Sequence, residues 1–147
     1  SRIMSLKDGL KKMSKSDPSD LSRINLTDSK DKIINKIKKA KTDSLPIPNE
    51  EQKLKDRPEA QNLIGIYSSI SNQTLDKTLY EFGGKNFSDL KNQLAEILLN
   101  KISPISDEIK KLIDNQDYLD KILLEGAAKA NEIARKKITE MQKIIGF

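Results

Sequence analysis

The spacing of the apolar residues in the second half of the chain constrains the fold most. They recur every three or four positions, along residues 90–98 and again along 118–145. Such spacing puts apolar side chains on one face of an α-helix, whereas a half-buried strand shows strict alternation. With 33% charged, 35% hydrophobic and only 4% aromatic residues, the composition is typical of helices with narrow apolar stripes. The sequence therefore predicts a mainly α-helical fold, a helical bundle.

Turn residues divide this helical pattern into segments. Pro58 is expected to begin a helix and Gly83-Gly84 to end another. Pro104 lies inside the longest pattern, and we expect it to kink or break that helix because proline removes a backbone hydrogen bond. Residues 2–6 are apolar enough for a short strand. Helices are expected at about residues 29–41, 58–69, 74–82, 88–113 and 118–145, with irregular chain at 7–23 and 42–57.

The apolar residues of these helices are expected to form the core, including the stripe of the last helix from Leu119 to Ile145. Small residues at 126–128 would let a partner helix approach it closely. On the first helix, Ile33 and Ile37 mark the inner face. Three lysines are assigned to the opposite, solvated face rather than to a dedicated RNA contact: Lys32, Lys36 and Lys39.

Composition also excludes several classes of protein. The chain has no Cys, which excludes a disulfide framework and thiolate metal sites and is compatible with a cytoplasmic location. No run approaches the roughly 20 apolar residues of a membrane span. The residues through Arg57 include 15 basic and 9 acidic side chains, whereas the rest include 12 and 13. The basic front half fits a phosphate-bearing ligand, although a nucleotide bias of the genome would also enrich Lys.

A short basic segment near the amino terminus has the most specific chemical signal. It reads Lys12-Met13-Ser14-Lys15-Ser16, followed by Asp17-Pro18. A regular helix cannot continue through Pro18, so the two lysines lie three residues apart on an irregular segment. Ammonium groups neutralise phosphate oxygens, and hydroxyl and backbone N–H groups add directed donors. Composition alone favours an ordinary solvated loop, but the order of these residues favours a polyphosphate-binding segment.

This string resembles the KMSKS signature loop of class I aminoacyl-tRNA synthetases, and its surroundings resemble bacterial and organellar tryptophanyl-tRNA synthetases. Further matches follow in the family's order along essentially the whole chain. The loop alone indicates only the class, whereas the ordered set favours the tryptophan enzymes over the tyrosine enzymes. The matching segments are Arg2-Ile3-Met4-Ser5-Leu6, Lys41-Thr42-Asp43-Ser44, Asn62-Leu63-Ile64-Gly65-Ile66-Tyr67-Ser68 and Glu125-Gly126-Ala127-Ala128-Lys129-Ala130-Asn131.

Part of the family's catalytic machinery is missing from this sequence. Class I synthetases place a His-rich signature early in a Rossmann-type fold, and this chain contains no His. It also lacks a Gly-rich strand-to-helix turn near its start. The resemblance implies that residues 1–23 are the end of a Rossmann-type catalytic domain and that residues 24–147 form a C-terminal helical domain that binds the tRNA anticodon. We expect this carboxy-terminal portion alone to be catalytically inactive.

The resemblance also implies a chemistry. The whole enzyme joins tryptophan to ATP, releases pyrophosphate and transfers the tryptophanyl group to tRNA(Trp). Lys12 and Lys15 match the family's catalytic lysines, and Lys15 is expected to stabilise the departing pyrophosphate. Mg²⁺ is expected to be held mainly by the phosphates, so no protein metal ligand is predicted. The expected ATP-binding set is Ile3, through its backbone against the adenine, together with Lys12, Met13, Ser14, Lys15 and Ser16.

The last helix contains the candidate tRNA contacts. Arg135, Lys136, Lys137 and Lys143 could bind phosphates, although each singly also fits an ordinary solvated helix charge. The expected partners of the full-length enzyme are tRNA(Trp), ATP, tryptophan and a second copy in a homodimer, without a membrane. A stand-alone tRNA-binding module and the carboxy-terminal part of a tyrosyl-type synthetase are the alternatives. The segment from Arg2 to Ser16 argues against the first, since a pure binder does not need a catalytic loop.

Overall fold

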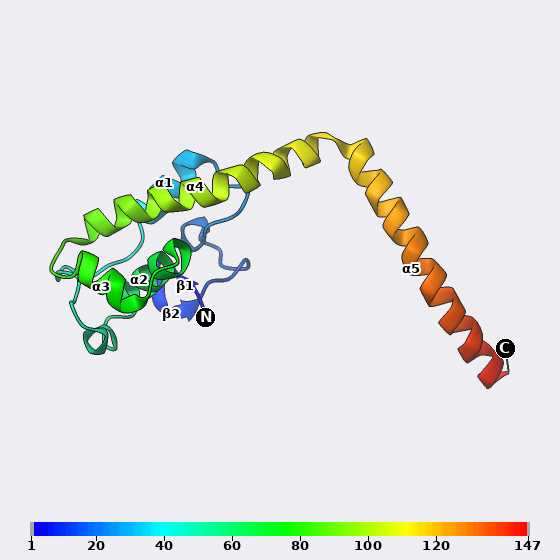
Figure 1. Cartoon of the computed structure of the whole chain (residues 1–147), viewed down its shortest axis with the longest axis horizontal. Helices are drawn as coiled ribbons and strands as arrows, with labels where there is room; N and C mark the ends of the chain where they lie inside the picture. Colours follow the sequence, from blue (N-terminus) through cyan, green and yellow to red (C-terminus); the bar gives the residue numbers. More distant parts are fainter. Residues whose placement is uncertain (1, 147) are drawn as a thin grey trace. The chain divides into compact units, whose positions relative to one another are not determined.

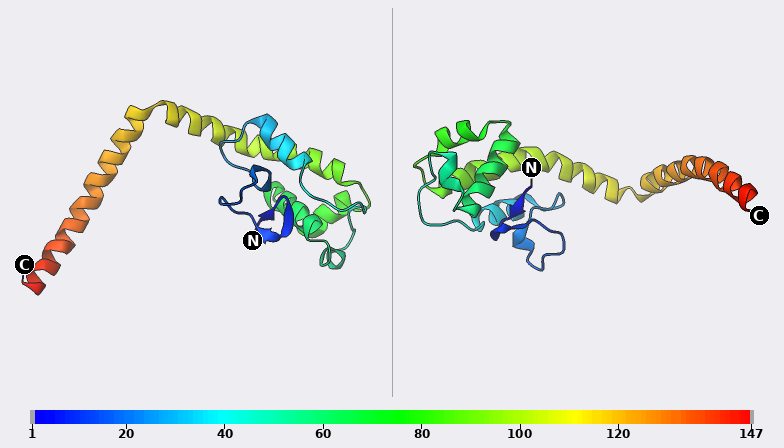
Figure 2. Two further views of the ribbon diagram at one scale, coloured as in Figure 1. Left: turned by 180° about the vertical axis from the view of Figure 1, so that it is seen from behind. Right: turned by 90° about the horizontal axis from the view of Figure 1, so that it is seen from below.

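The computed structural model describes residues 2–146. The chain divides into two compact units, residues 1–106 and 107–147. The described residues contain five α-helices and one two-stranded sheet (Figures 1 and 2). The prediction of a mainly α-helical fold with a short strand near its start is therefore confirmed.

The helices begin and end close to the expected positions. Pro58 occupies the first turn of its helix, as expected. The Ser29 and Thr74 side chains cap two others by accepting from the backbone N–H groups of Lys32 and Lys77. The helices are α1 (Lys30–Lys38), α2 (Pro58–Ser71), α3 (Leu75–Phe82), α4 (Phe87–Asp114) and α5 (Gln116–Ile145).

Two short strands, β1 (Met4–Ser5) and β2 (Asp8–Lys12), form an antiparallel hairpin. Residues 7–23 are therefore not irregular throughout as expected, since they include β2 and a 3-10 helix at Asp20–Ser22. Leu6, at the turn, explains why the hairpin forms. Its side chain is buried, its N–H donates to the Ser22 carbonyl at 2.9 Å, and its carbonyl accepts from the Lys41 N–H at 2.7 Å. Contacts with distant residues thus stabilise a weak local pattern.

The helices of the first unit share one core. On α2, the Tyr67 ring packs edge-on against Phe82 of α3, with ring centroids 4.8 Å apart. The Tyr67 hydroxyl donates to Gln93 Oε1 of α4 at 3.2 Å. Lys91 of α4 donates to the Ala40 carbonyl after α1 at 2.7 Å. The most deeply buried apolar side chains include Ile33, Ile37, Leu63, Ile64, Leu79, Phe82, Leu90 and Leu94.

Lys36 departs from the expected distribution of charge. The prediction of a solvated face is correct for Lys32 and Lys39 but wrong for Lys36, which is 2% exposed. Its Nζ lies 2.6 Å from Asp28 Oδ2 and 2.9 Å from Asp20 Oδ2. Lys36 follows the buried Ile33 by three positions, and residues three apart are neighbours on a helix surface. It therefore lies at the edge of the buried face, where two carboxylates neutralise it.

The helix α4 continues through Pro104, so of the kink or break expected there, the break does not occur. A proline removes only one backbone hydrogen bond, and contacts on both sides support this helix. Ile102 packs against the core, and the buried Ser106 donates its hydroxyl proton to the Leu26 carbonyl. This helix begins at Phe87, one residue before the expected position, so Ser88 lies within its first turn.

The second unit contains the end of α4 and the whole of α5. None of the described residues of α5 is buried, so the core role expected for its apolar stripe is not observed. Leu123, Ile133 and Met141, for example, are each more than half exposed. No helix among residues 2–146 is long and apolar enough to cross a membrane.

The connection between α1 and α2 is mostly irregular, as expected, but it includes a 3-10 helix at Glu51–Leu54 and is well anchored. Arg57 Nε donates to Asp43 Oδ2 at 2.8 Å, and Nη1 donates to the Pro46 carbonyl at 2.7 Å. Ile47 and Leu54 are both 1% exposed. The hydrogen-bonded Arg57 guanidinium holds the pKa of the Asp43 carboxyl below its usual value. This connection is therefore part of the folded unit.

We expect Asp43→Asn to lower the stability of the chain near neutral pH but not in acid. Because the folded pKa of Asp43 is below the unfolded value of 3.8, the carboxylate stabilises the fold above that value. The contribution is lost as the pH falls through the folded pKa. Urea denaturation at about pH 7 and about pH 2.5 should show a difference in unfolding free energy that shrinks at the lower pH. An equal difference at both pH values would contradict this account.

Candidate functional site

The candidate site is the Lys/Ser loop, residues 12–16, which begins where the hairpin ends. Lys12 is the last residue of β2 and pairs with Met4 of β1. The next residue, Met13, donates its N–H to the Ile3 carbonyl at 3.1 Å. Its side chain packs against the core, so Met13 anchors the loop on apolar protein. The loop therefore starts from a hydrogen-bonded base.

Side-chain-to-backbone bonds shape the loop itself. The Ser14 hydroxyl accepts from the Ser16 N–H at 3.2 Å, and the Asp17 carboxylate accepts from the Ser19 N–H at 2.8 Å. Ser and Asp side chains form such local turns in place of regular structure. Lys15 lies between the two serines and is exposed. The serines thus fix the backbone that presents this lysine.

Arg23 and Lys36 hold the far end of the loop. Arg23 Nη1 donates to the Asp17 carbonyl at 2.9 Å and to the Ser19 carbonyl at 3.4 Å. Asp20, one residue after Ser19, contacts the Lys36 ammonium at 2.9 Å. The hydrogen bond from Lys36 lowers the pKa of the Asp20 carboxyl. Both ends of the loop are therefore bound to the folded unit, one through β1 and the other through α1.

The two lysines of the loop are available to an anion. Lys12 and Lys15 are exposed, and neither forms an ion pair with a carboxylate of residues 2–146, whereas the neighbouring Lys11 pairs with Asp8 at 3.7 Å. A cavity of about 410 Å³ lies beside the loop, lined by Met13, Ser14, Lys15, Arg23 and residues 24–26. The Lys15 ammonium, the Arg23 guanidinium and the Ser14 hydroxyl beside this cavity, with the exposed Lys12 nearby in the sequence, fit a polyphosphate.

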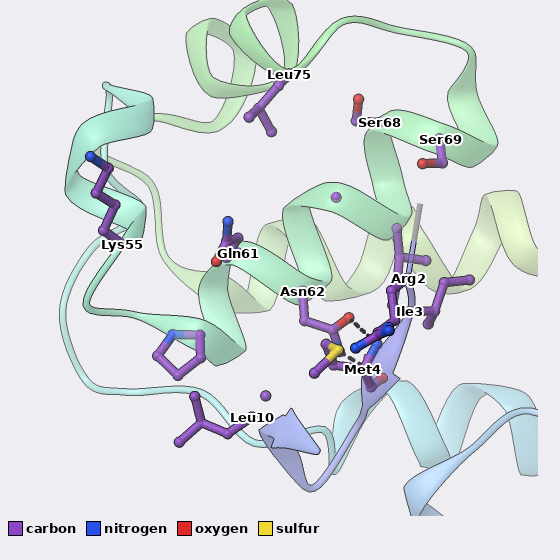
Figure 3. Close-up of a pocket in the computed structure, with 14 residues that line it drawn as sticks. Arg2, Ile3, Met4, Leu10, Lys55, Gln61, Asn62, Ser68, Ser69 and Leu75 are labelled. Atoms are coloured by element: carbon purple, nitrogen blue, oxygen red, sulfur yellow. Dashed lines mark hydrogen bonds between the residues drawn. The ribbon is translucent and has the colours of Figure 1, made fainter. Parts of the chain in front are cut away.

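A second cavity, of about 530 Å³, lies between the hairpin and α2 (Figure 3). Arg2, Ile3 and Met4 line it from β1 and the residues before it, and Asn62 lines it from α2. Ile3 is 46% exposed, and its carbonyl is already bonded to Met13. The predicted adenine contact, Ile3, is therefore hydrogen-bonded to Met13, whose sequence neighbours Lys12 and Ser14 are predicted phosphate contacts.

The remaining candidate residues lie in the second unit. Lys136 and Lys137 pair with Glu132 and Glu140 at 3.3 and 2.8 Å. Lys143 lies seven residues beyond Lys136, which puts these two on the same face of α5. These basic residues are all exposed. Among residues 2–146, no group of three or more His, Cys, Asp or Glu side chains could hold a metal ion.

Comparison with known proteins decides the family. The family model for class I tRNA synthetases (W and Y) matches residues 1–102. The chain belongs to this synthetase family. The matched part includes the hairpin, the Lys/Ser loop and helices α1 to α3, so the synthetase resemblance of the loop is confirmed in its structural context.

Individual synthetases extend the match to almost the whole chain. The sequence is 53% identical to a tryptophan–tRNA ligase of Agrobacterium fabrum and 50% identical to one of Rhizobium meliloti, each over 99% of this chain. The chain spans 41% of the length of these two relatives.

Solved structures agree with the sequence comparisons. A tryptophanyl-tRNA synthetase from Mycoplasma pneumoniae superposes with a TM-score of 0.73 at 28% identity, covering 99% of this chain and 45% of its own. A tryptophanyl-tRNA synthetase from Campylobacter jejuni, complexed with ADP and tryptophan, gives a TM-score of 0.76 over 100% of this chain and 44% of its own. At 23% identity, that second likeness supports the fold alone.

Sequence reasoning missed the residues that support the site. Asn62 was part of a matching string, but nothing in the string indicates that its amide binds β1. Arg23 has no helical or strand pattern around it. The spacing of Lys36 from Ile33 could have indicated a partly buried ammonium, and Asp28 eight residues earlier is a suitable partner.

Proposed function

We propose that this chain is the carboxy-terminal part of a tryptophan–tRNA ligase. That enzyme joins tryptophan to ATP and transfers the tryptophanyl group to tRNA(Trp). The observation that carries the proposal is the Lys/Ser loop, anchored at both ends and presenting two ammonium groups that pair with no carboxylate of residues 2–146. The relatives named tryptophan–tRNA ligase, 53% and 50% identical over 99% of the chain, favour tryptophan over tyrosine.

In the activation step, the tryptophan carboxylate attacks the α-phosphorus of ATP, and the bond to the pyrophosphate oxygen breaks. Negative charge grows on the departing pyrophosphate. Cations placed where charge develops stabilise the transition state more than the bound substrate, and only such interactions accelerate the step. Lys15 and Lys12 have this role in our proposal. Mg²⁺ bound with ATP would add charge neutralisation through the phosphates.

The other residues of the loop bind and orient. Ser14 and Ser16 supply hydroxyl or backbone donors to phosphate oxygens, and Met13 fixes the start of the loop by packing against the core. The backbone of Ile3 lies against the adenine. Because Met13 and Ile3 are hydrogen-bonded at 3.1 Å, nucleotide base and phosphates are positioned by one piece of backbone.

In the complete enzyme, this chain contributes to two domains. Residues 1–23 are the end of the catalytic domain, and residues 24–147 form the helical domain that binds the tRNA. The candidate phosphate contacts are on α5, and the complete enzyme is a cytoplasmic homodimer. The basic residues concerned are Arg135, Lys136, Lys137 and Lys143.

Pyrophosphate exchange by the full-length protein tests the function. With ATP, labelled pyrophosphate and tryptophan, we expect label to enter ATP. With tyrosine in place of tryptophan, the rate of incorporation should be at least about 100-fold lower, because a side-chain pocket can discriminate between the two amino acids to that extent. Exchange with tyrosine alone would indicate a tyrosyl-type enzyme. Binding of tRNA without any exchange would instead support a binding module without catalysis.

A further inference from the structure

One side chain of α2 completes the outer edge of β1. Asn62 Oδ1 accepts from the Met4 N–H at 2.9 Å, and its Nδ2 donates to the Met4 carbonyl at 2.9 Å and to the Ser5 carbonyl at 3.3 Å. The dashed lines of Figure 3 mark bonds of this set. A carboxamide is the chemical equivalent of a peptide group. Asn62 therefore binds Met4 as a neighbouring strand would.

The hairpin needs this support because it is very small. The strand β1 has two residues and pairs irregularly with β2, the register shifting between Met4 and Ser5. An isolated two-stranded hairpin is marginally stable at best in water. Asn62 is 8% exposed, so its bonds are largely shielded from water, and a shielded amide that lost its partners would be costly.

The start of α2 holds the hairpin from β2 as well. A Cβ on Gly9 would lie 2.4 Å from the Pro58 carbonyl carbon and 2.5 Å from the Glu59 nitrogen. Only glycine allows this approach between two backbones. Glu59 also pairs with Lys41 at 2.7 Å, and the Leu6 carbonyl accepts from the Lys41 N–H. The first turns of α2 thus contact both strands and are linked to the turn between them through Lys41.

We propose that Asn62 is a positioning residue for ATP, acting through the backbone of Ile3 and Met4. The inference rests on the proposed function, since it takes the Ile3 backbone as the adenine contact. Asn62 does not touch the nucleotide in this account. It fixes the orientation of the Ile3 carbonyl, which in turn accepts from Met13 at the start of the Lys/Ser loop. The helical part of the chain thereby sets the geometry of the ATP site.

Binding of ATP and of tryptophan to the full-length enzyme, measured separately by calorimetry, tests this role. Asn62→Asp keeps the volume and the acceptor for the Met4 N–H but loses the donor to the Met4 and Ser5 carbonyls, and Asn62→Ala loses all three bonds. We expect each variant to raise the Kd for ATP about tenfold, because the lost buried hydrogen bonds orient the backbone that binds ATP. The Kd for tryptophan should stay within about twofold, because these bonds do not orient the tryptophan site. If Asn62→Ala does not fold, the Asn62→Asp variant alone tests the positioning role.

Ile64→Val is the matched control, because Ile64 is fully buried on the same helix and its hydrocarbon side chain cannot form a hydrogen bond to β1. It loosens the core by one methylene and should leave both Kd values unchanged. An unchanged Kd for ATP in Asn62→Asp, in an enzyme whose wild type binds ATP, would overturn the positioning role alone. Equal weakening of ATP and tryptophan would also overturn it. A wild type that binds no ATP would overturn the proposed function and this inference together.

Discussion

Replacing Lys15 with alanine in the full-length enzyme should lower the maximal rate of tryptophan-dependent pyrophosphate exchange by about 100- to 1,000-fold, the usual effect of losing one preorganised group at a developing charge. The ammonium of Lys15 is exposed and has no carboxylate partner among the described residues. No carboxylate among residues 2–146 therefore offsets its charge, which is available to the pyrophosphate. The loss should appear mainly in the maximal rate, because the charge develops in the transition state.

Lys11→Ala provides the matched control for this measurement. Lys11 is one residue from the loop, is exposed and pairs with Asp8 on its own strand. Removing it changes the net charge by the same amount as Lys15→Ala without touching the loop, so exchange should change by less than about threefold. Similar losses in the two variants would show that general positive charge, rather than a placed ammonium, supports the reaction. An unchanged rate in Lys15→Ala would refute the assigned role.

The second large effect concerns stability. Lys36→Met should lower the free energy of unfolding of the 147-residue chain by about 3 kcal/mol, because removing one member of a buried ion pair leaves the other charge uncompensated. The buried partner left behind is Asp28, whose side chain is 4% exposed and 2.6 Å from the ammonium, whereas the second partner, Asp20, is 53% exposed and remains hydrated. Lys32→Met removes a lysine from the exposed face of the same helix and should stay within about 0.5 kcal/mol of wild type.

A double substitution separates the ion pair from simple packing. Asp28→Asn keeps an acceptor for the Asn25 N–H, which Asp28 now binds at 2.8 Å, and removes the uncompensated charge. Lys36→Met combined with Asp28→Asn should therefore be more stable than Lys36→Met alone, as urea denaturation can measure. If the two substitutions add without coupling, the pair does not stabilise the fold as a unit.

The helices could be predicted from the sequence because their signals are local. Ser29 and Thr74 cap their helices and Pro58 begins one, and each acts on neighbours within a few residues. Pro104 shows the limit of a local rule, since contacts at Ile102 and Ser106 outweigh one missing backbone bond. Local sequence rules therefore predict that a helix forms more reliably than they predict where it breaks.

The hairpin and its support could not be predicted, because the interactions that form them span long distances in the sequence. The segment from Asp8 to Lys12 shows no alternation of apolar and polar residues, and it is paired because Leu6 is buried and Asn62 binds β1 from 58 residues away. The loop lysines were found from their order alone. The residues that hold the loop, such as Arg23, have no signal that a single sequence reveals.

The last helix shows a different limit. Its stripe from Leu119 to Ile145 correctly predicted a helix, but periodicity only says that one face is apolar and not what covers it. Within the described residues none of α5 is buried. A pattern that indicates a core face can therefore belong to a surface whose partner lies outside the residues that define the pattern.

The anchoring of the Lys/Ser loop at both ends has a consequence for cleavage of the chain. A protease that cuts after Lys15 would break one peptide bond in an exposed turn. It would break none of the hydrogen bonds that attach the two ends of the loop to the folded unit. The piece before the cut would stay attached through Asn62, through the Leu6 bonds to Ser22 and Lys41, and through Met13 on the core. The two fragments would therefore remain associated without a covalent link, as one nicked but folded body.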